Sequence, residues 1–305
     1  MDWTAEIEAA AARIAGHVVR TPVMQSDTLW DRPVALKLEQ TQHTGSFKAR
    51  GAFNTLLAAK VPDAGIVAAS GGNHGAAVAF AARRLGHRAR IFVPEMAGPA
   101  KIALIERAGA ALTVVPGEYA DAAAMAARFR DEQGAIEVHP YDAPATVAGQ
   151  GTLMLEWEDQ GLDADTVLIA VGGGGLIAGA MAWTHGRKRI VAVEPMSCNA
   201  LAAAMQAGKP VDVPVSGVAA NALGARRIGS ICFDLARAQD VQTVLVPDGA
   251  ILEAQKSLWQ AHRLLVEPAG ATALAALQWG AYKPEPGERV AVLLCGGNIA
   301  PDPLS

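Results

Sequence analysis

Short apolar runs rich in β-branched residues alternate with alanine-rich runs along most of this chain, and this alternation limits its possible folds more than any other feature. The runs expected to form strands are residues 34–39, 66–70, 89–93, 111–115, 166–171, 189–194 and 289–294. Helices are expected at residues 47–60, 75–85, 99–108, 119–132, 145–160 and 176–185. Strands separated by helices of this length are typical of parallel sheets covered on both faces. The pattern predicts an α/β protein whose strand-end loops gather at one sheet edge, where such folds bind ligands.

The composition indicates a folded protein of about two domains. The chain has 305 residues, of which 51% are hydrophobic and 18% charged, so it has enough apolar material for a sizeable core. Its net charge of −4 argues against general nucleic-acid binding. The cysteines Cys198, Cys232 and Cys295 form no CxxC pair and favour neither a disulfide framework nor a zinc site.

Neither a targeting segment nor a membrane span is recognisable. The N-terminal segment mixes acidic residues into an amphipathic helical pattern and lacks the basic start and apolar centre of a signal peptide. Consecutive glycines interrupt the longest charge-free stretch, residues 166–185, so a buried strand, a loop and a buried helix explain it better than a transmembrane helix. We therefore expect a cytoplasmic protein without membrane contact.

A run of glycines follows one strand candidate and precedes the helical sequence LIAGAMAW; it consists of Gly172, Gly173, Gly174 and Gly175. Glycines let the backbone approach an anion closely, and N–H groups at the start of a helix can hold it, so the loop predicts a phosphate site. The run lacks a P-loop lysine and is not a GxGxxG on the first strand–helix unit, which disfavours a dinucleotide. A merely tight turn is the alternative reading.

Two further loops combine glycine with polar side chains. The motif SGGNHG at residues 70–75 offers backbone donors, the Ser70 hydroxyl and the Asn73 amide, which suits a carboxylate; a glycine-rich turn capped by Asn73 is the alternative. His74 is more readily explained as a structural histidine than as a general base. Cys295 ends the last apolar strand before two glycines, and a buried inert thiol is its ordinary explanation.

Lys48 lies at the expected start of a helix that Ser46 could cap. The positive end of the helix would lower the pKa of the lysine and favour the neutral amine that forms Schiff bases. An exposed surface lysine is the alternative when this motif is taken alone.

Together and in this order, these motifs resemble the fold-type II (tryptophan synthase β-like) enzymes that use pyridoxal 5′-phosphate (PLP), and within them the serine/threonine dehydratase and serine racemase branch. The matching segments are LKLEQTQHTGSFKARGAFN (36–54), SGGNHG (70–75), AGQGT (148–152), VGGGGLIAG (171–179), VEP (193–195), VEPAGA (266–271) and LLCGGN (293–298). The resemblance spans nearly the whole chain. It implies two open parallel or mixed sheets covered by helices, with PLP in the interdomain cleft. It places a large PLP-binding domain at residues 1–61 and 141–305 and a small mobile domain at residues 62–140.

The resemblance also implies a role for each matching residue. Lys48 would bind PLP covalently as the internal aldimine and then act as the base on the substrate α-proton. The residues that would hold the cofactor are Phe47, Lys48, Asn73, Gly172, Gly173, Gly174, Gly175, Leu176 and Cys295. The residues that would hold the substrate carboxylate are Ser70, Gly72, Asn73, His74 and Gln150.

Departures from the pattern of this branch refine the expected activity. Cys295 would face the pyridine nitrogen, and a neutral thiol stabilises a ring N–H⁺ less than a carboxylate does, which favours prompt loss of a β-hydroxyl over racemisation. Racemases of this branch carry a serine where this chain has Gly71. The segment Ala220-Asn221-Ala222 replaces Ala-Asp-Gly, which leaves substrate choice open.

A divalent cation is left uncertain. Members of the branch bind one through a Glu, a backbone carbonyl and an Asp. Glu194 and the Cys198 carbonyl match the first two ligands, but Ala200 stands at the third position, which weakens a hard-cation site. We also expect no C-terminal regulatory domain after Ser305, which favours a catabolic role.

The implied function is a lyase of amino-acid metabolism, an ammonia-lyase that dehydrates and deaminates L-serine or L-threonine to a 2-oxo acid and ammonia. The alternatives are another PLP reaction in the same pocket, such as 3-hydroxyaspartate dehydration, racemisation or β-replacement, and a non-catalytic PLP-binding module. The expected partner is a small amino-acid substrate, with neither nucleic acid nor membrane, and the resemblance implies a homodimer.

Overall fold

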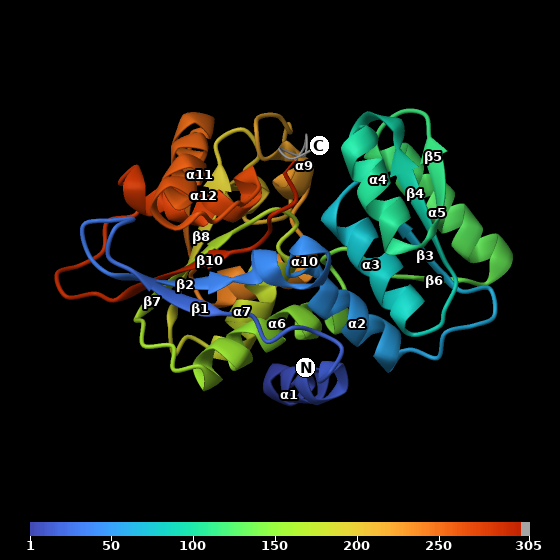
Figure 1. Cartoon of the computed structure of the whole chain (residues 1–305), viewed down its shortest axis with the longest axis horizontal. Coiled ribbons are helices and arrows are strands. Elements are labelled where there is room, and N and C mark those ends of the chain that lie inside the picture. Colours follow the sequence, from blue (N-terminus) through green and yellow to red (C-terminus); the bar gives the residue numbers. More distant parts are fainter. Residues whose placement is uncertain (300–305) are drawn as a thin grey trace.

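The larger of the two sheets in the described structure has six strands and lies in one half of the molecule, while the smaller sheet lies in the other half (Figure 1). The computed structural model describes residues 1–299. The strand order is β1-β2-β10-β7-β8-β9, and every neighbouring pair is parallel except β1 and β2. The strands are β1 (Val23–Ser26), β2 (Val34–Leu38), β7 (Thr166–Ala170), β8 (Arg189–Pro195), β9 (Gln242–Val246) and β10 (Val290–Leu294). Strand β10, the last strand within residues 1–299, therefore lies inside the sheet, between β2 and β7.

Helices cover both faces of this sheet (Figure 1). One face carries α11 (Asp248–His262) and α12 (Pro268–Gln278), and the other carries α1 (Trp3–Ile14), α6 (Pro144–Asp159) and α7 (Gly175–Thr184). Between β8 and β9 the chain forms α8 (Ala200–Ala207), α9 (Ala220–Leu223) and α10 (Ser230–Ala238). Because both faces are covered, every residue of β2, β7 and β10 is buried. These strands are accordingly mainly apolar, and the exceptions are Lys37 in β2 and Thr166 in β7.

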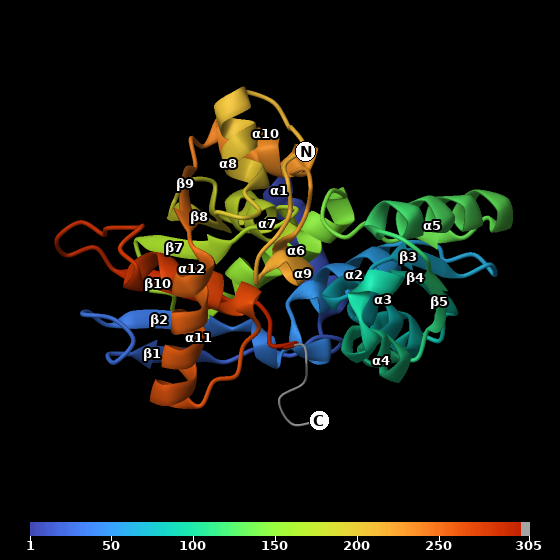
Figure 2. The ribbon, with the colours of Figure 1, turned by 90° about the horizontal axis from the view of Figure 1, so that it is seen from above.

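A second, smaller sheet is built within residues 66–137 and has the order β5-β4-β3-β6, all parallel. Its strands are β3 (Ile66–Ala69), β4 (Ala89–Pro94), β5 (Ala111–Val115) and β6 (Ile136–Glu137). Figure 2 shows α3 (Asn73–Arg84) and α4 (Pro99–Ala108) on one face and α5 (Tyr119–Gln133) on the other. Successive side chains of β3 therefore point to opposite faces of the sheet. Ile66 and Ala68 belong to the core under α3, and Val67 and Ala69 belong to the core under α5.

Helix α2 (Lys48–Ala58) lies where the two sheets and their helices meet. It packs against α6 of the larger unit and against α3 of the smaller one. Two short 3-10 turns, η1 (Glu39–Thr41) and η2 (His43–Gly45), lead from β2 into it, and a third, η3 (Glu95–Ala97), follows β4. The first residue of α2 is therefore placed at the junction of the two units.

The predicted α/β class with parallel and mixed sheets is confirmed. Each predicted strand forms, with its ends within one residue of those expected. Strands β1, β6 and β9 and the helices from α8 to α12 were not predicted, and β1 adds an antiparallel edge. No helix within residues 1–299 combines the length and the apolar character needed to cross a bilayer.

Candidate active site

Lys48 is the first residue of α2, and its side chain is half-buried. Its Nζ donates a hydrogen bond of 2.7 Å to the Pro140 carbonyl and lies 5.1 Å from the centre of the Phe47 ring. Burial lowers the pKa of Lys48 to about 8, although the nearby Cys295 and Glu267 oppose this shift. The amine therefore loses its proton more readily than an ordinary lysine, as a group that attacks a carbonyl must.

The backbone before Lys48 is joined to the end of β10. Ser46 forms an isolated bridge with Gly296, and the Phe47 N–H donates to the Cys295 carbonyl at 3.2 Å. The Cys295 side chain is buried, and its Sγ donates to the Ala269 carbonyl at 3.4 Å. Burial raises the pKa of this thiol, so Cys295 is a neutral group beside the lysine. These contacts bring Lys48 and Cys295 together from opposite ends of the chain.

The expectation that Ser46 caps α2 is wrong. Phe47 occupies the N-cap position, and no side-chain cap bond forms there. Because Ser46 is extended and bridged to Gly296, its backbone lies outside the helix. Its Oγ is buried and has no hydrogen-bond partner within the described residues. An unpaired buried hydroxyl beside a reactive lysine is a group that a ligand would satisfy.

The glycine run connects β7 to α7 and is surrounded so closely that side chains would not fit. A Cβ on Gly173 would come within 2.2 Å of the Tyr141 ring, and one on Gly172 within 2.8 Å of the Leu223 backbone. Gly174 has φ +94°, and a Cβ there would meet the Cys232 sulfur at 2.5 Å. The first turn of α7, which contains the buried Leu176, presents N–H groups without intrahelical partners. The loop has the form of a phosphate cradle.

The segment that contains Pro140 and Tyr141 links the lysine to this cradle, and the sequence patterns did not reveal it. The Pro140 carbonyl accepts from Lys48, and the next residue, Tyr141, packs against the glycines. The His139 Nδ1 atom accepts hydrogen bonds from the backbone N–H groups of Tyr141 at 3.3 Å and Asp142 at 2.8 Å. The Asp142 carboxylate in turn accepts from the first residues of α10. The segment is therefore fixed both by hydrogen bonds within it, to His139, and by hydrogen bonds from α10 to Asp142.

The loop at residues 70–75 connects β3 to α3 on the other side of Lys48. The Ser70 hydroxyl accepts from the Gly72 N–H at 3.2 Å, and Asn73 begins the helix. The His74 Nε2 atom contacts the Val138 carbonyl at 2.8 Å. Burial and the charge of Lys48 lower the pKa of His74 to about 3, so its imidazole is neutral and serves as a donor to that carbonyl. This geometry agrees with a structural histidine rather than a general base.

Glu267 is a site residue that sequence reasoning missed, although it lies in the motif VEPAGA. It precedes α12, is buried, and accepts a 2.5 Å hydrogen bond from the Asn73 amide. Asn298 donates to the other end of the same amide, at 2.9 Å from the Asn73 Oδ1 atom. Burial raises the pKa of Glu267 to about 7, and the hydrogen bond from Asn73 and the charges of Lys101 and Lys48 only partly oppose it. An acidic residue inside an apolar run was the signal that could have singled it out.

Gln150 projects from α6 against α2. A Cβ on Gly51, one helical turn beyond Lys48, would come within 2.5 Å of the Gln150 Nε2 atom. A Cβ on Gly149 would lie 2.7 Å from the Gly51 Cα atom, so the two helices touch through glycines. The Gln150 Oε1 atom is buried without a partner within residues 1–299, which makes it a second unpaired acceptor near the lysine.

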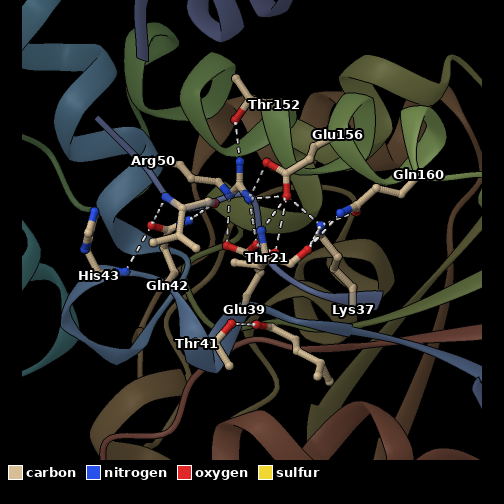
Figure 3. Close-up of polar contacts among 12 residues, drawn as sticks. Thr21, Lys37, Glu39, Thr41, Gln42, His43, Arg50, Thr152, Glu156 and Gln160 are labelled. Carbon is tan, nitrogen blue, oxygen red and sulfur yellow. Dashed lines mark hydrogen bonds and ion pairs between the residues drawn. The ribbon is translucent and has the colours of Figure 1, made fainter. Parts of the chain in front are cut away.

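A buried network of charges, centred on Arg50, holds α2 in place (Figure 3). The Arg50 guanidinium donates to both carboxylate oxygens of Glu39, at 2.8 and 2.9 Å, and to both of Glu156, at 2.9 and 3.0 Å. Lys37 donates to Glu156 at 2.6 Å. The network joins β2, η1, α2 and α6, with two positive charges balancing two negative ones. It fixes the direction in which α2 presents Lys48.

Glu194 and Cys198, which match two ligands of a cation site, are both buried. The Glu194 carboxylate oxygens accept from the N–H groups of Leu201 at 2.7 Å and Ala202 at 2.8 Å, in the first turn of α8. Burial raises the pKa of Glu194 to about 7. Ala200 contributes no oxygen ligand, and within residues 1–299 no three His, Cys, Asp or Glu side chains gather as a metal site would require. The surroundings of Glu194 suit a helix cap better than a hard cation.

Comparison with known proteins agrees with this geometry. Residues 14–296 match the family described as pyridoxal-phosphate dependent enzyme. The L-threonine ammonia-lyase of Geobacter sulfurreducens is 36% identical over 301 residues, covering 96% of this chain and 75% of that protein. The phenylserine dehydratase of Ralstonia pickettii is 37% identical over 296 residues, covering 94% of this chain and 90% of that protein. The structure of maize serine racemase superposes with a TM-score of 0.92 at 32% identity, covering 99% of this chain and 95% of that one.

The two-sheet architecture, with a lysine at a helix start and a glycine cradle opposite, is that of a fold-type II enzyme. The chain belongs to the pyridoxal-phosphate dependent enzyme family. Its own residues fit that cofactor, since they include an amine of lowered pKa, a loop that accepts only glycine, and the unpaired buried oxygens of Ser46 and Gln150.

Proposed function

We propose that this protein is an ammonia-lyase that eliminates water from L-serine or L-threonine. A water molecule then hydrolyses the resulting imine, which releases ammonia and a 2-oxo acid. The observation that carries the proposal is the pairing of Lys48, whose pKa is lowered to about 8, with the buried neutral thiol of Cys295. The names of the relatives support a reaction of this class.

Bound PLP supplies a sink for the electrons released when a bond to the substrate Cα atom breaks. The residues that would hold it are Lys48, Phe47 and the backbone of Gly172, Gly173, Gly174, Gly175 and Leu176. Asn73, which is oriented by hydrogen bonds to Glu267 and Asn298, would contact the ring hydroxyl. Lys48 also takes the proton from Cα, as its lowered pKa allows.

The substrate carboxylate is held at the loop that begins α3. Its donors are the Ser70 hydroxyl and the backbone of Gly72, Asn73 and His74 at the positive end of the helix. Gln150 offers its amide from α6. This arrangement turns the Cα–H bond towards Lys48 and leaves the β-hydroxyl free to depart.

Elimination is favoured over racemisation for two reasons that concern this chain's own residues. Cys295 would stand by the ring nitrogen of the bound cofactor as a neutral thiol, and its proton is directed to the Ala269 carbonyl, so it would supply no charge to stabilise negative charge at the substrate Cα atom. At Gly71 no side chain can move a proton on the second face of the substrate, and a Cβ there would lie 2.5 Å from the Ala97 Cβ atom.

We also propose that residues 62–140 close over the substrate as a small domain, and that the protein works as a cytoplasmic homodimer. The complete sheet within residues 66–137 supports an independent body, and exclusion of water during the reaction gives closure a purpose. Light scattering on the purified protein tests the dimer.

The decisive experiment is to measure 2-oxo acid released from L-serine and L-threonine by the PLP-loaded protein, with and without Mg²⁺. We expect product from the wild type and none above background from Lys48→Ala, while Lys60→Ala, on the exposed segment after α2, keeps wild-type turnover. Full turnover by Lys48→Ala would refute the proposed mechanism. A rate unchanged by Mg²⁺ would agree with Glu194 as a helix cap.

A further inference from the structure

Lys101 is a buried cation that the proposed mechanism does not use. It lies in the first turn of α4, and only 6% of the residue is exposed. Its Nζ donates to one backbone carbonyl, that of Asn221 on α9, at 3.2 Å. Within residues 1–299 it forms no ion pair with a carboxylate. A desolvated ammonium group without a counter-ion is costly, so such groups are usually paired or functional.

The Lys101 amine lies directly beside the loop that begins α3. A Cβ built on Gly72 would be 3.5 Å from the Lys101 Nζ atom and 3.6 Å from the Asn221 carbonyl oxygen. Gly72 is the N-cap residue of α3, a helix of 12 residues. The amine and the positive helix end therefore act on the same small volume, and both favour an anion there.

Lys101 and Asn221 also line a cavity of about 40 Å³ between the two units. Lys101, Glu267, Asn298 and Asn221 supply its polar lining, and Val218 and Ala222 are among its apolar walls. One Glu267 oxygen already accepts from Asn73. Burial lowers the pKa of Lys101 while the charge of Glu267 opposes the shift, although the two side chains form no ion pair. The cavity has room for a group of a few atoms and presents one cation to it.

We propose that Lys101 binds a carboxylate of the amino-acid substrate in this cavity. The proposal rests on the proposed function only in placing the substrate amine at the cofactor held by Lys48. Two sources of the carboxylate share this chemistry. One is the α-carboxylate that every amino acid carries, and the other is a side-chain carboxylate such as that of 3-hydroxyaspartate.

Unreactive ligands test the proposal without relying on turnover. The PLP-loaded wild type and Lys101→Met are titrated with ethylamine, L-alanine and L-aspartate, and binding is followed by the change in cofactor absorption. Ethylamine carries no carboxylate, L-alanine carries one and L-aspartate carries two. Lys256→Met, an exposed lysine on α11, is the matched control. Lys101→Arg tests rescue by a retained positive charge.

We expect Lys101→Met to weaken a carboxylate ligand by about 10- to 100-fold, the range for a lost charge-assisted hydrogen bond, while ethylamine binding stays within about twofold. A loss seen already with L-alanine assigns Lys101 to the α-carboxylate. A loss confined to L-aspartate assigns it to the side chain and points to acidic substrates. Lys101→Arg should recover part of either loss.

Two results would overturn the proposal. The first is an equal weakening of all three ligands, as expected if Lys101 merely holds α4 against α9. The second is no change for any ligand. If Lys101→Met does not bind PLP, Lys101→Gln is titrated with the same three ligands, and the proposal is judged by the same results. Because the readout is binding, a protein that releases no 2-oxo acid still reports on Lys101.

Discussion

The side-chain amide of Asn73 lies 2.5 Å from the Glu267 carboxyl and joins the loop before α3 to the residue that begins α12. Asn298 holds the other end of the amide, so Asn73 can present only one remaining N–H to a ligand. Glu267 thus acts through Asn73 as a positioning residue. Burial raises its pKa to about 7, so its carboxyl group changes charge near neutral pH.

Glu267 should make the stability of the cofactor-free protein depend on pH. Its folded pKa of about 7 exceeds the ordinary value of 4.5, so folding favours the protonated form. This contribution is complete below about pH 4.5 and is lost as the pH rises through about 7; the shift corresponds to roughly 3 kcal/mol. Urea unfolding between pH 5 and 8 should show a smaller decline for Glu267→Gln than for the wild type. Parallel curves for the two proteins would contradict this prediction.

Arg50→Met should destabilise the protein by about 3–5 kcal/mol. It leaves the buried Glu39 carboxylate without an ion-pair partner among residues 1–299, and Glu156 with Lys37 as its remaining one. The matched control is Arg128→Met, which removes an exposed ion pair with Glu132 and should change stability by less than about 1 kcal/mol. Urea unfolding of the three proteins measures both differences. Equal losses of stability in the two variants would show that the buried network contributes no more to stability than an exposed ion pair does.

Gly173→Ala should weaken PLP binding by at least about tenfold, because the added Cβ would overlap the Tyr141 ring and displace the cradle. Gly249→Ala is its control, since a Cβ there meets no atom within 4 Å. Absorption titrations with PLP measure both affinities. Wild-type affinity in Gly173→Ala would mean that the glycine loop does not hold the cofactor.

Gly71→Ser should lower stability by about 1–3 kcal/mol, because the new Cβ would collide with Ala97. The double variant Gly71→Ser/Ala97→Gly relieves that collision and should recover most of the stability. We expect α-proton exchange of L-serine in D₂O, followed by NMR, to rise in the double variant and not in Ala97→Gly alone. Exchange that is equal in all of these variants would remove Gly71 as a determinant of the reaction.

The local pattern along the chain was enough to predict the strands that alternate with helices and the loops at their ends. Strand β6 was missed because two residues carry no recognisable period, and α12 because a helix buried on all sides lacks an amphipathic pattern. Glu267 and Tyr141 were missed because their importance comes from contacts between distant segments. Glu194 matched a ligand position in sequence, but only the structure reveals that its oxygens already meet α8.

The position of β10 has a consequence for how the protein is made. As the chain leaves the ribosome, β2 and β7 both emerge well before β10, the strand that separates them in the sheet. The smaller sheet can form while synthesis continues, since its strands are close in sequence. The larger sheet remains incomplete between β2 and β7 until β10 is available. The segment before Lys48 therefore lacks its partners at Cys295 and Gly296 until β10 has been synthesised, so the cofactor site can be completed only after that strand is in place.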